Sequence, residues 1–330
     1  MTPVIPERMR AMVVERPGPP EVLQLQELPT PRPGPGEALV EVHTVTVNQS
    51  LDIGVRSGRY DKIPPLPVIL GCDPSGVVVE LGQGLTEPAV GTRVAINGLR
   101  DGGYCEYIAV PAEKLVSIPD GVSFAVASIV TRHFPMAYHL AREASLQPGE
   151  WLLVMGAAGG LGSAAVQVGK MLGARVIAGA GSNGRVALAL DKGADFGVNY
   201  READLETEVL RITNGHGVDV AFENSSDPVL WPAAQRCLAD KGRLMTGGAH
   251  AGGLVMLDTR ILYHRHQRVI GTAGGRREDA EAALAAAARG KLKVDIFKTF
   301  PLAELPQAHA LAESGQALGK VVIQVRPQLV

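Results

Sequence analysis

The sequence has few of the features that mark secreted, membrane-bound or nucleic-acid-binding proteins. Its three cysteines, Cys72, Cys105 and Cys237, are scattered and form no C-x-x-C pair, so we expect reduced thiols in a cytoplasm and no structural zinc lobe. No apolar run reaches the length of a membrane span, and the N-terminal MTPVIPERMR lacks the apolar core of a signal peptide. The net charge of −2, without a long run of like charge, favours no nucleic-acid partner.

The length and the hydrophobic content predict two domains. A chain of 330 residues with 46% hydrophobic residues can bury a sizeable core. Residues 10–118 contain short apolar runs separated by proline and glycine, a pattern typical of a β-barrel or sandwich. Strands alternate with helices in the second half, and Val321–Val325 reads as a final strand that returns to the first domain. We predict an α/β protein in which residues 124–272 are inserted between 1–123 and 273–330. The candidate strands of the inserted domain are Trp151–Met155, Arg175–Ala178, Phe196–Asn199, Val218–Phe222, Arg243–Thr246 and Val269–Thr272.

The segment Trp151–Gly173 reads as a buried strand, a glycine-rich turn and a helix. Such a turn lets backbone N–H groups approach a pyrophosphate at the positive end of the helix dipole, and a Cβ would block that approach. Ordinary tight turns also contain such glycines, but a second apolar strand begins at Arg175, which is the spacing of a dinucleotide site. The residues predicted to hold the pyrophosphate are Gly156, Ala158, Gly159, Gly160 and Leu161.

Motifs spread over nearly the whole chain resemble those of one superfamily. They include PGPGEALVEV at Pro33–Val42, LGCDPSGVVVELG at Leu70–Gly82, the segment Leu146–Ala174, KGADFGVNYRE at Lys192–Glu202 and LGKVVI at Leu318–Ile323. Taken together, they resemble the medium-chain dehydrogenase/reductase superfamily in its zinc-free quinone-oxidoreductase and enoyl-reductase branch. The resemblance implies a GroES-like β-barrel catalytic domain, a Rossmann domain with a doubly wound parallel sheet, and a substrate cleft between them.

The second strand of the predicted Rossmann domain ends without an acid. An NAD site usually has an Asp or Glu there, which accepts from the ribose 2′-OH. Here the strand runs to Gly181, and Ser182 and Arg185 follow. Hydroxyl and guanidinium donors suit a 2′-phosphate, and the resemblance places Tyr200 at the adenosine end of the cofactor. The alternative is that Arg185 is a solvated helix residue and Tyr200 is ordinary packing. We predict that NADPH is the cofactor and that Gly181, Ser182, Arg185 and Tyr200 bind it.

The positions that bind catalytic zinc in metal-dependent relatives hold other residues here. The early cysteine position falls on Asn48–Ser50, the Gly-His-Glu position reads Gly71-Cys72-Asp73, and the position near the domain junction falls on Thr131. Catalytic zinc needs three firm protein ligands and an open position. We therefore predict that the protein binds no metal and that Cys72 is a small buried residue.

Without zinc, hydrogen-bond donors must stabilise the oxyanion that develops on the substrate. The resemblance places the nicotinamide and the substrate near Asn48, Tyr60 and a predicted loop at Thr131–Pro135. Asn48 is expected to bond the carboxamide or the substrate oxygen, whereas Tyr60 either donates to a carbonyl or packs in the barrel. His133 has the chemistry of a proton donor and Arg132 that of an anion-binding group, unless both point outward. The predicted catalytic residues are Asn48, Tyr60 and His133.

The remaining expectations concern the nicotinamide and the reaction. Strand carboxyl ends face the ligand in this fold, so Gly247, Ala249, Ile270 and Thr272 are expected to flank the nicotinamide. Tyr263–His266 reads as a polar loop rather than a metal-binding strand. We predict an NADPH-dependent reductase that transfers hydride to a small-molecule acceptor, either a quinone or an α,β-unsaturated carbonyl compound. A zinc alcohol dehydrogenase with atypical ligands and a nucleotide-binding protein with little catalysis are the alternatives. A homodimer is expected by analogy with the family.

Overall fold

The computed structural model describes residues 4–60 and 62–326, and its chain divides into two compact units. Unit 1 combines the chain up to Arg132 with the chain from Ala280 onwards, and unit 2 is the insertion His133–Asp279. The predicted boundaries, after residues 123 and 272, lie earlier in the chain. The first differs because α2 (Phe124–Glu143) is one continuous helix that contributes residues to both units.

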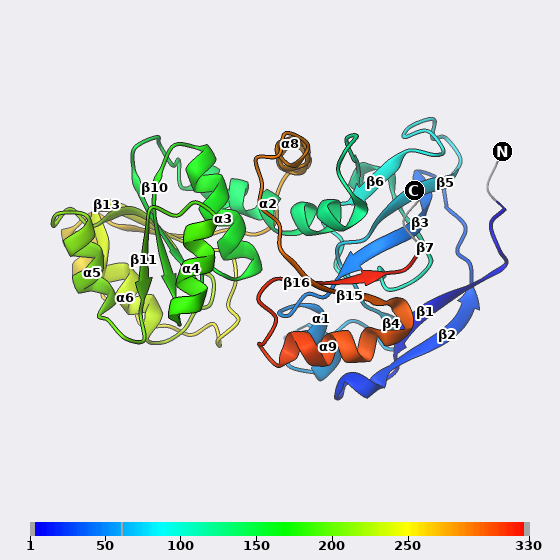
Figure 1. Ribbon diagram of the computed structural model, residues 1–330, viewed down its shortest axis with the longest axis horizontal. Helices are drawn as coiled ribbons and strands as arrows, with labels where there is room; N and C mark the ends of the chain where they lie inside the picture. Colours follow the sequence, from blue (N-terminus) through cyan, green and yellow to red (C-terminus); the bar gives the residue numbers. More distant parts are fainter. Residues whose placement is uncertain (1–3, 61, 327–330) are drawn as a thin grey trace. The chain divides into compact units, whose positions relative to one another are not determined.

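Unit 1 is a β-rich unit built around a seven-stranded sheet, with a smaller sheet beside it. The large sheet has the order β15-β16-β3-β5-β6-β8 with β7 on β3, and the small one has the order β2-β1-β4. The last strand pairs with β3 in antiparallel fashion, with Val322 opposite Thr46, so the C-terminal segment completes the unit that the N-terminal segment begins (Figure 1). The strands are β1 (Arg8–Val14), β2 (Leu23–Pro29), β3 (Glu37–Thr46), β4 (Val68–Ile69), β5 (Ser75–Leu81), β6 (Arg93–Ile96), β7 (Tyr107–Pro111), β8 (Leu115–Ser117), β15 (Ile296–Pro301) and β16 (Lys320–Gln324), and the helices are α1 (Asp52–Ser57), α8 (Arg277–Ala288), whose first residues belong to unit 2, and α9 (Leu305–Glu313).

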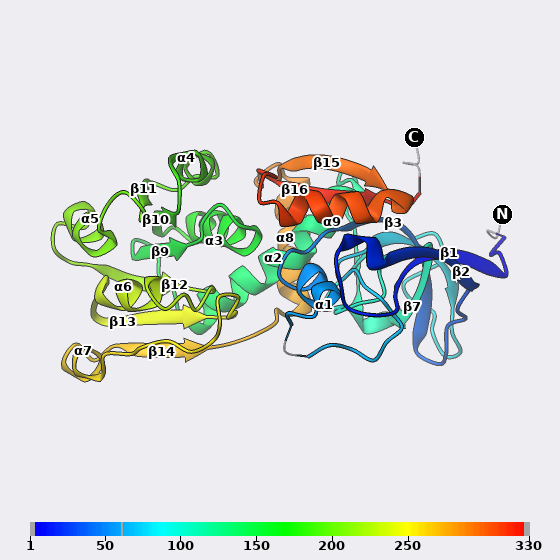
Figure 2. The same cartoon turned by 90° about the horizontal axis from the view of Figure 1, so that it is seen from below.

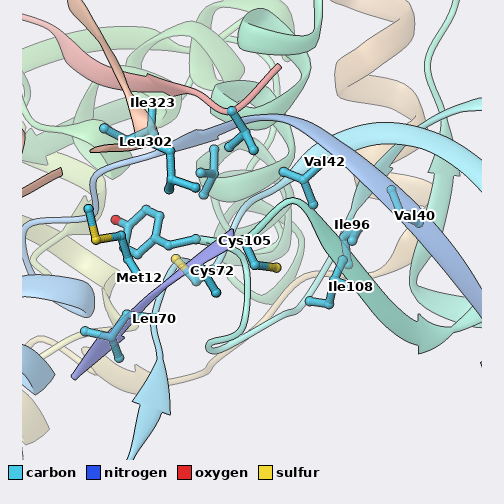
Figure 3. Close-up of a cluster of buried hydrophobic side chains, with 14 of the residues drawn as sticks. Met12, Val40, Val42, Leu70, Cys72, Ile96, Cys105, Ile108, Leu302 and Ile323 are labelled. Carbon is cyan, nitrogen blue, oxygen red and sulfur yellow. The ribbon is translucent and has the colours of Figure 1, made fainter. Parts of the chain in front are cut away.

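The core of unit 1 is formed by apolar side chains on the inner faces of these strands. Figure 3 shows Cys72 and Cys105 enclosed by apolar side chains, among them those of Met12 and Leu70. Burial of each large aliphatic side chain contributes about 1.5–3 kcal/mol, so this cluster accounts for much of the stability of the unit. Both cysteines are free thiols.

Unit 2 is a six-stranded parallel sheet in the order β11-β10-β9-β12-β13-β14. Helices α3 and α4 cover one face of it, and α5 and α6 cover the other (Figure 2). This arrangement confirms the predicted doubly wound sheet. The strands are β9 (Trp151–Met155), β10 (Arg175–Ala180), β11 (Phe196–Asn199), β12 (Val218–Phe222), β13 (Leu238–Thr246) and β14 (Arg268–Gly271), and the helices are α3 (Gly160–Met171), α4 (Asn183–Asp191), α5 (Leu205–Ile212), α6 (Leu230–Arg236) and α7 (Thr259–His264).

Two loop predictions are wrong. Thr131–Pro135 lies inside α2, where Pro135 is buried and packs against Gly275, so tertiary packing offsets the lost helix hydrogen bond. Tyr263 and His264 end helix α7, whose first N–H groups donate to the side chain of Asp258. Among the residues that the structure describes, no helix is both long and apolar enough to span a bilayer.

Candidate functional site

The turn after β9 requires glycine at defined positions. Gly156 has φ of 63°, a left-handed conformation that most residues avoid. A Cβ on Gly162 would lie 2.2 Å from the carbonyl oxygen of Gly156, so no larger residue fits the packing of α3 against the turn. Gly159 and Gly160 are exposed, and no side chain caps the first N–H groups of α3. The turn therefore presents backbone donors at the positive end of a helix, as a pyrophosphate requires. Ala158 and Leu161 are half-buried in the same turn.

The imidazole of His133 lies against this turn. A Cβ on Gly160 would be 2.4 Å from Nε2 of His133 and 2.8 Å from the adjacent ring carbons. A larger residue at position 160 would therefore displace the histidine ring that lies over it. The alternative that His133 points outward is not met, because its ring faces the N-terminus of α3 within unit 2, and the predicted catalytic role of His133 stays a prediction.

Several donors converge on Gly181, which follows β10. A Cβ on Gly181 would lie 3.2 Å from both Oη of Tyr200 and Nε of Arg201. Ser182 caps α4 and accepts from the backbone N–H of Arg185 at 3.4 Å. Burial raises the pKa of Tyr200, while the positive charges of Arg201 and Arg185 act to lower it. Both guanidinium groups are therefore close enough to favour negative charge at the tyrosine hydroxyl.

Sequence reasoning missed Arg201, although the signal was available. Arg201 directly follows Tyr200, a predicted cofactor-binding residue, and both come after β11, whose carboxyl end lies beside that of β10. One acid, Glu202, is also near this turn, and its carboxylate accepts from the side-chain amide of Asn183 at 3.0 Å. The end of β10 itself carries no acid, as the sequence indicates.

A second group of residues follows the carboxyl ends of β13 and β14, at the opposite side of the unit 2 sheet from β11. The backbone N–H of Gly247 donates to Oδ1 of Asn224 at 2.7 Å, and a Cβ on Gly247 would lie 1.9 Å from the terminal methyl of Met136. The hydroxyl of Thr272 is 2.6 Å from Nε2 of His139. Ala249 is exposed and Ile270 is half-buried.

The sheet order arranges these groups in one row. The edge at the strand carboxyl ends runs from Tyr200 after β11, through Gly181 after β10 and Gly156 after β9, to Gly247 after β13 and Thr272 after β14. A dinucleotide binds an α/β sheet along this edge. The row therefore fits a nicotinamide dinucleotide with its adenosine ribose at the Tyr200 end, its pyrophosphate at the glycine turn, and its nicotinamide at the Thr272 end.

In unit 1, Asn48 follows β3 and is 3% exposed. Its backbone N–H donates to Oδ2 of Asp52 at 2.8 Å, and Oη of Tyr104 donates to the same oxygen at 2.8 Å. The side-chain Nδ2 of Asn48 has no hydrogen-bond partner among the described residues. A buried amide without an acceptor is costly, so this donor is suited to a ligand oxygen.

Two carboxylates are buried beside Cys72, and two cations face them. Asp73 accepts from the backbone N–H of Thr46 at 2.8 Å and from the hydroxyl of the same residue. Burial raises the pKa of Asp73, and burial followed by repulsion from Asp73 raises that of Asp52 to about 7. Burial lowers the pKa of Lys320, while the negative charge of Asp73 opposes that shift.

Arg132 belongs to the same cluster. Burial acts to lower its pKa, but Cys72 and the carboxylates of Asp73 and Asp52 outweigh this effect and raise it. Arg132 thus faces the buried carboxylates, and its interpretation as an anion-binding group for the substrate stays untested. Sequence reasoning missed Lys320 and Asp52, because these residues are distant in sequence from the motif that they neighbour.

Cys72 has the properties of a buried thiol. Its pKa is raised well above the usual value, first by burial and then by Asp52 and Asp73. The thiolate that would bind a metal is thus disfavoured. Within residues 4–60 and 62–326, no three His, Cys, Asp or Glu side chains are grouped so as to hold a metal ion.

Tyr60 and Thr131 occupy structural positions. The ring of Tyr60 packs on α1, where a Cβ on Gly54 would lie 3.3 Å from Cδ2, and it contacts the core of unit 1. The hydroxyl of Thr131 donates to the carbonyl of Ala127 at 2.8 Å within α2. The structure thus supports packing for Tyr60, and the catalytic prediction for this residue stays untested.

Comparison with known proteins identifies the family. Residues 34–120 match the family described as alcohol dehydrogenase GroES-like domain, and residues 160–289 match the one described as zinc-binding dehydrogenase. The chain is 32% identical to a quinone oxidoreductase of Salmonella typhimurium, over 93% of this chain and 96% of that protein. It is also 31% identical to an NAD-dependent alcohol dehydrogenase of Sulfolobus acidocaldarius, over 96% of this chain and 100% of that protein.

A solved structure gives the same picture. A mycobacterial protein in complex with NADPH superposes with a TM-score of 0.84 at 28% identity, covering 96% of this chain and 100% of the other. The chain belongs to the medium-chain dehydrogenase/reductase superfamily, in its quinone oxidoreductase branch, and is an oxidoreductase with a GroES-like domain and a Rossmann domain. The predictions of family, fold and enzyme class are confirmed.

Proposed function

We propose that the protein is an NADPH-dependent, zinc-free reductase that delivers hydride to a quinone or an α,β-unsaturated carbonyl compound. The observation that carries the cofactor choice is the set of donors around Gly181. Ser182, Tyr200 and two arginines surround a strand end that lacks an acid, and such donors bind a 2′-phosphate through charge-assisted hydrogen bonds. Bound NADPH supplies the hydride. The residues of this chain bind and orient the cofactor and stabilise the charge that develops on the acceptor.

Asn48 is our leading candidate for stabilising that charge. Its Nδ2 is buried and has no acceptor within the described residues. A fixed amide donor in a water-excluded environment stabilises a developing oxyanion more strongly than water does. His133, whose ring lies over Gly160, remains a proposed proton donor for turnover, and Tyr60 a proposed wall or donor of the acceptor site.

The test combines binding with a substrate screen. We expect purified protein to bind NADPH at least tenfold more tightly than NADH in calorimetry, and to oxidise NADPH with quinones or enones equally well with and without a chelator. Tighter binding of NADH would refute the cofactor assignment. Activity on alcohols that a chelator abolishes would instead indicate a zinc alcohol dehydrogenase, and NADPH binding without turnover would indicate a protein with little catalysis.

We further propose a cytoplasmic homodimer that forms along β14. This strand is the edge of the unit 2 sheet, so its outer backbone groups lack a partner strand within the described chain. Apolar side chains are exposed on and near it, including Val269 on the strand and Leu254 and Met256 before it. Light scattering that gives the monomer mass at micromolar concentration would exclude the dimer. The buried free thiols are compatible with a reducing compartment.

A further inference from the structure

A chain of hydrogen-bonded side chains joins the end of β14 to α2 and α8. Oγ1 of Thr272 lies 2.6 Å from Nε2 of His139, and Nδ1 of His139 lies 3.0 Å from Nη2 of Arg142. Arg142 in turn makes two bonds to the carboxylate of Asp279, at 2.7 and 2.9 Å. All four residues belong to unit 2.

The chemistry of these groups fixes where the protons lie. A guanidinium has only donors, so Nδ1 of His139 accepts from Arg142 and the proton of the neutral imidazole is on Nε2. That proton is then donated to Oγ1 of Thr272. The other charged group facing Nδ1 is the carboxylate of Glu143, at the longer distance of 3.9 Å.

Asp279 holds the far end of this chain as a carboxylate. Burial acts to raise its pKa, but hydrogen bonds from the Arg142 side chain and the Arg276 backbone outweigh burial and keep the pKa below its usual value. The two bonds between Arg142 and Asp279 fix the guanidinium plane, and a fixed guanidinium fixes the tautomer of His139.

The consequence is a directed hydroxyl. Because Oγ1 of Thr272 already accepts from His139, its own hydrogen must point elsewhere, and within the described residues this oxygen makes no other hydrogen bond. Thr272 is half-buried, and its backbone N–H is held by the carbonyl of Thr246 at 2.9 Å. Its carbonyl oxygen lies close to Gly247, at 3.1 Å from where a Cβ on that glycine would be. The hydroxyl is thus presented from a rigid position at the carboxyl end of the edge strand.

We propose that the hydroxyl of Thr272 donates to the carboxamide oxygen of the nicotinamide, an inference that rests on the proposed NADPH site. His139, Arg142 and Asp279 are then positioning residues that orient this donor. Thr272 lies at the opposite end of the sheet edge from the donors at Gly181. These four hydrogen-bonded residues therefore act on the nicotinamide half of the cofactor and not on its adenosine half.

The test compares two ligands that share only one half. Calorimetry measures the affinities of NADPH and of 2′,5′-ADP, which has the 2′-phosphate but no nicotinamide. A neutral hydrogen bond contributes about 0.5–1.5 kcal/mol, so Thr272→Val is expected to weaken NADPH about twofold to tenfold and to leave 2′,5′-ADP unchanged. Thr259→Val, the same change at an exposed threonine that begins α7, is the matched control and should affect neither ligand.

Variants at His139 separate positioning from packing. His139→Leu should reproduce the selective loss of NADPH affinity, whereas His139→Gln, whose amide nitrogen can replace the Nε2 donor, should restore most of it. Nitrogen NMR of labelled histidine should show the Nε2-protonated tautomer for His139 in the wild type, and loss of that preference in Asp279→Asn.

The outcomes distinguish this proposal from the cofactor assignment. If Thr272→Val binds NADPH as tightly as the wild type while 2′,5′-ADP still binds, the inference is overturned and the NADPH site stands. If Thr272→Val lowers the affinity for both ligands equally, the four hydrogen-bonded residues only stabilise unit 2, and the inference is overturned as well. If wild-type protein does not bind 2′,5′-ADP, the proposed cofactor fails and the inference fails with it.

Discussion

The cofactor assignment can be tested by removing the two arginines near Gly181, separately and together. Arg185 and Arg201 both affect the hydroxyl of Tyr200 electrostatically, and both are exposed. A hydrogen bond to a charged group contributes about 1.5–3 kcal/mol, and solvent screening at exposed positions favours the lower end. A loss of about 1.5 kcal/mol corresponds to about tenfold in affinity. We therefore expect Arg185→Ala and Arg201→Ala each to weaken NADPH about tenfold, with NADH unaffected.

The assay is calorimetry with NADPH and NADH at one fixed ionic strength, because phosphate contacts by arginine depend on salt. Arg211→Ala is the matched control, since Arg211 is an exposed arginine of unit 2 that pairs with Glu208 on α5 and faces no predicted cofactor residue. The double variant should bind NADPH and NADH with nearly equal affinity. If either arginine variant lowers the affinity for NADH as much as that for NADPH, the guanidinium does not recognise the 2′-phosphate, and our reasoning about the end of β10 is wrong.

Three further predictions follow from individual contacts. Gly162→Ala places a Cβ 2.2 Å from the Gly156 carbonyl, so we expect a lower melting temperature and weaker binding of both dinucleotides, whereas Gly184→Ala in helix α4, with open space around it, should not lower the melting temperature. The pKa of Asp52 is raised from 3.8 to about 7, so the folded state keeps a proton that the unfolded chain loses, and the free energy of unfolding should fall as pH rises between these values. Denaturant titrations of Asp52→Asn should lack that fall; an unchanged pH profile would contradict the assignment. Asn48→Leu should lower kcat about 10²-fold with an unchanged KM for NADPH; a raised KM with normal kcat would move Asn48 to the carboxamide.

Much of unit 2 could be predicted because local sequence and tertiary structure agree there. β9, β11 and β12 have the predicted bounds, since each is a short apolar run bounded by turn residues. The glycines of the turn after β9 are fixed by close backbone contacts between neighbours in sequence, which a spacing pattern reveals. The predicted loop at Thr131–Pro135 is wrong because α2 continues through it, with Pro135 packed against Gly275.

The functional clusters that sequence reasoning missed are assembled from distant segments. His139 meets Thr272 only because β14 ends beside α2, and neither residue type suggests the other. Lys320 reaches Asp73 because the C-terminal strand pairs with β3. Single-sequence patterns report local periodicity and therefore contain no signal for such pairs.

We infer that the buried charges of unit 1 set the environment of the proposed oxyanion donor. Asp52 and Lys320 have pKa values shifted towards their neutral forms, whereas Arg132 is held as a cation by the carboxylate of Asp73 and its neighbours. Asn48, Asp52 and Asp73 are at most 3% exposed, so this cluster is shielded from solvent. In that low-dielectric environment the unpartnered Nδ2 of Asn48, whose backbone is fixed by Asp52, is a stronger donor than it would be in water. The cluster would thus support catalysis by orienting the amide donor of Asn48 and by keeping water away from it. A metal ion would instead coordinate the substrate oxygen directly.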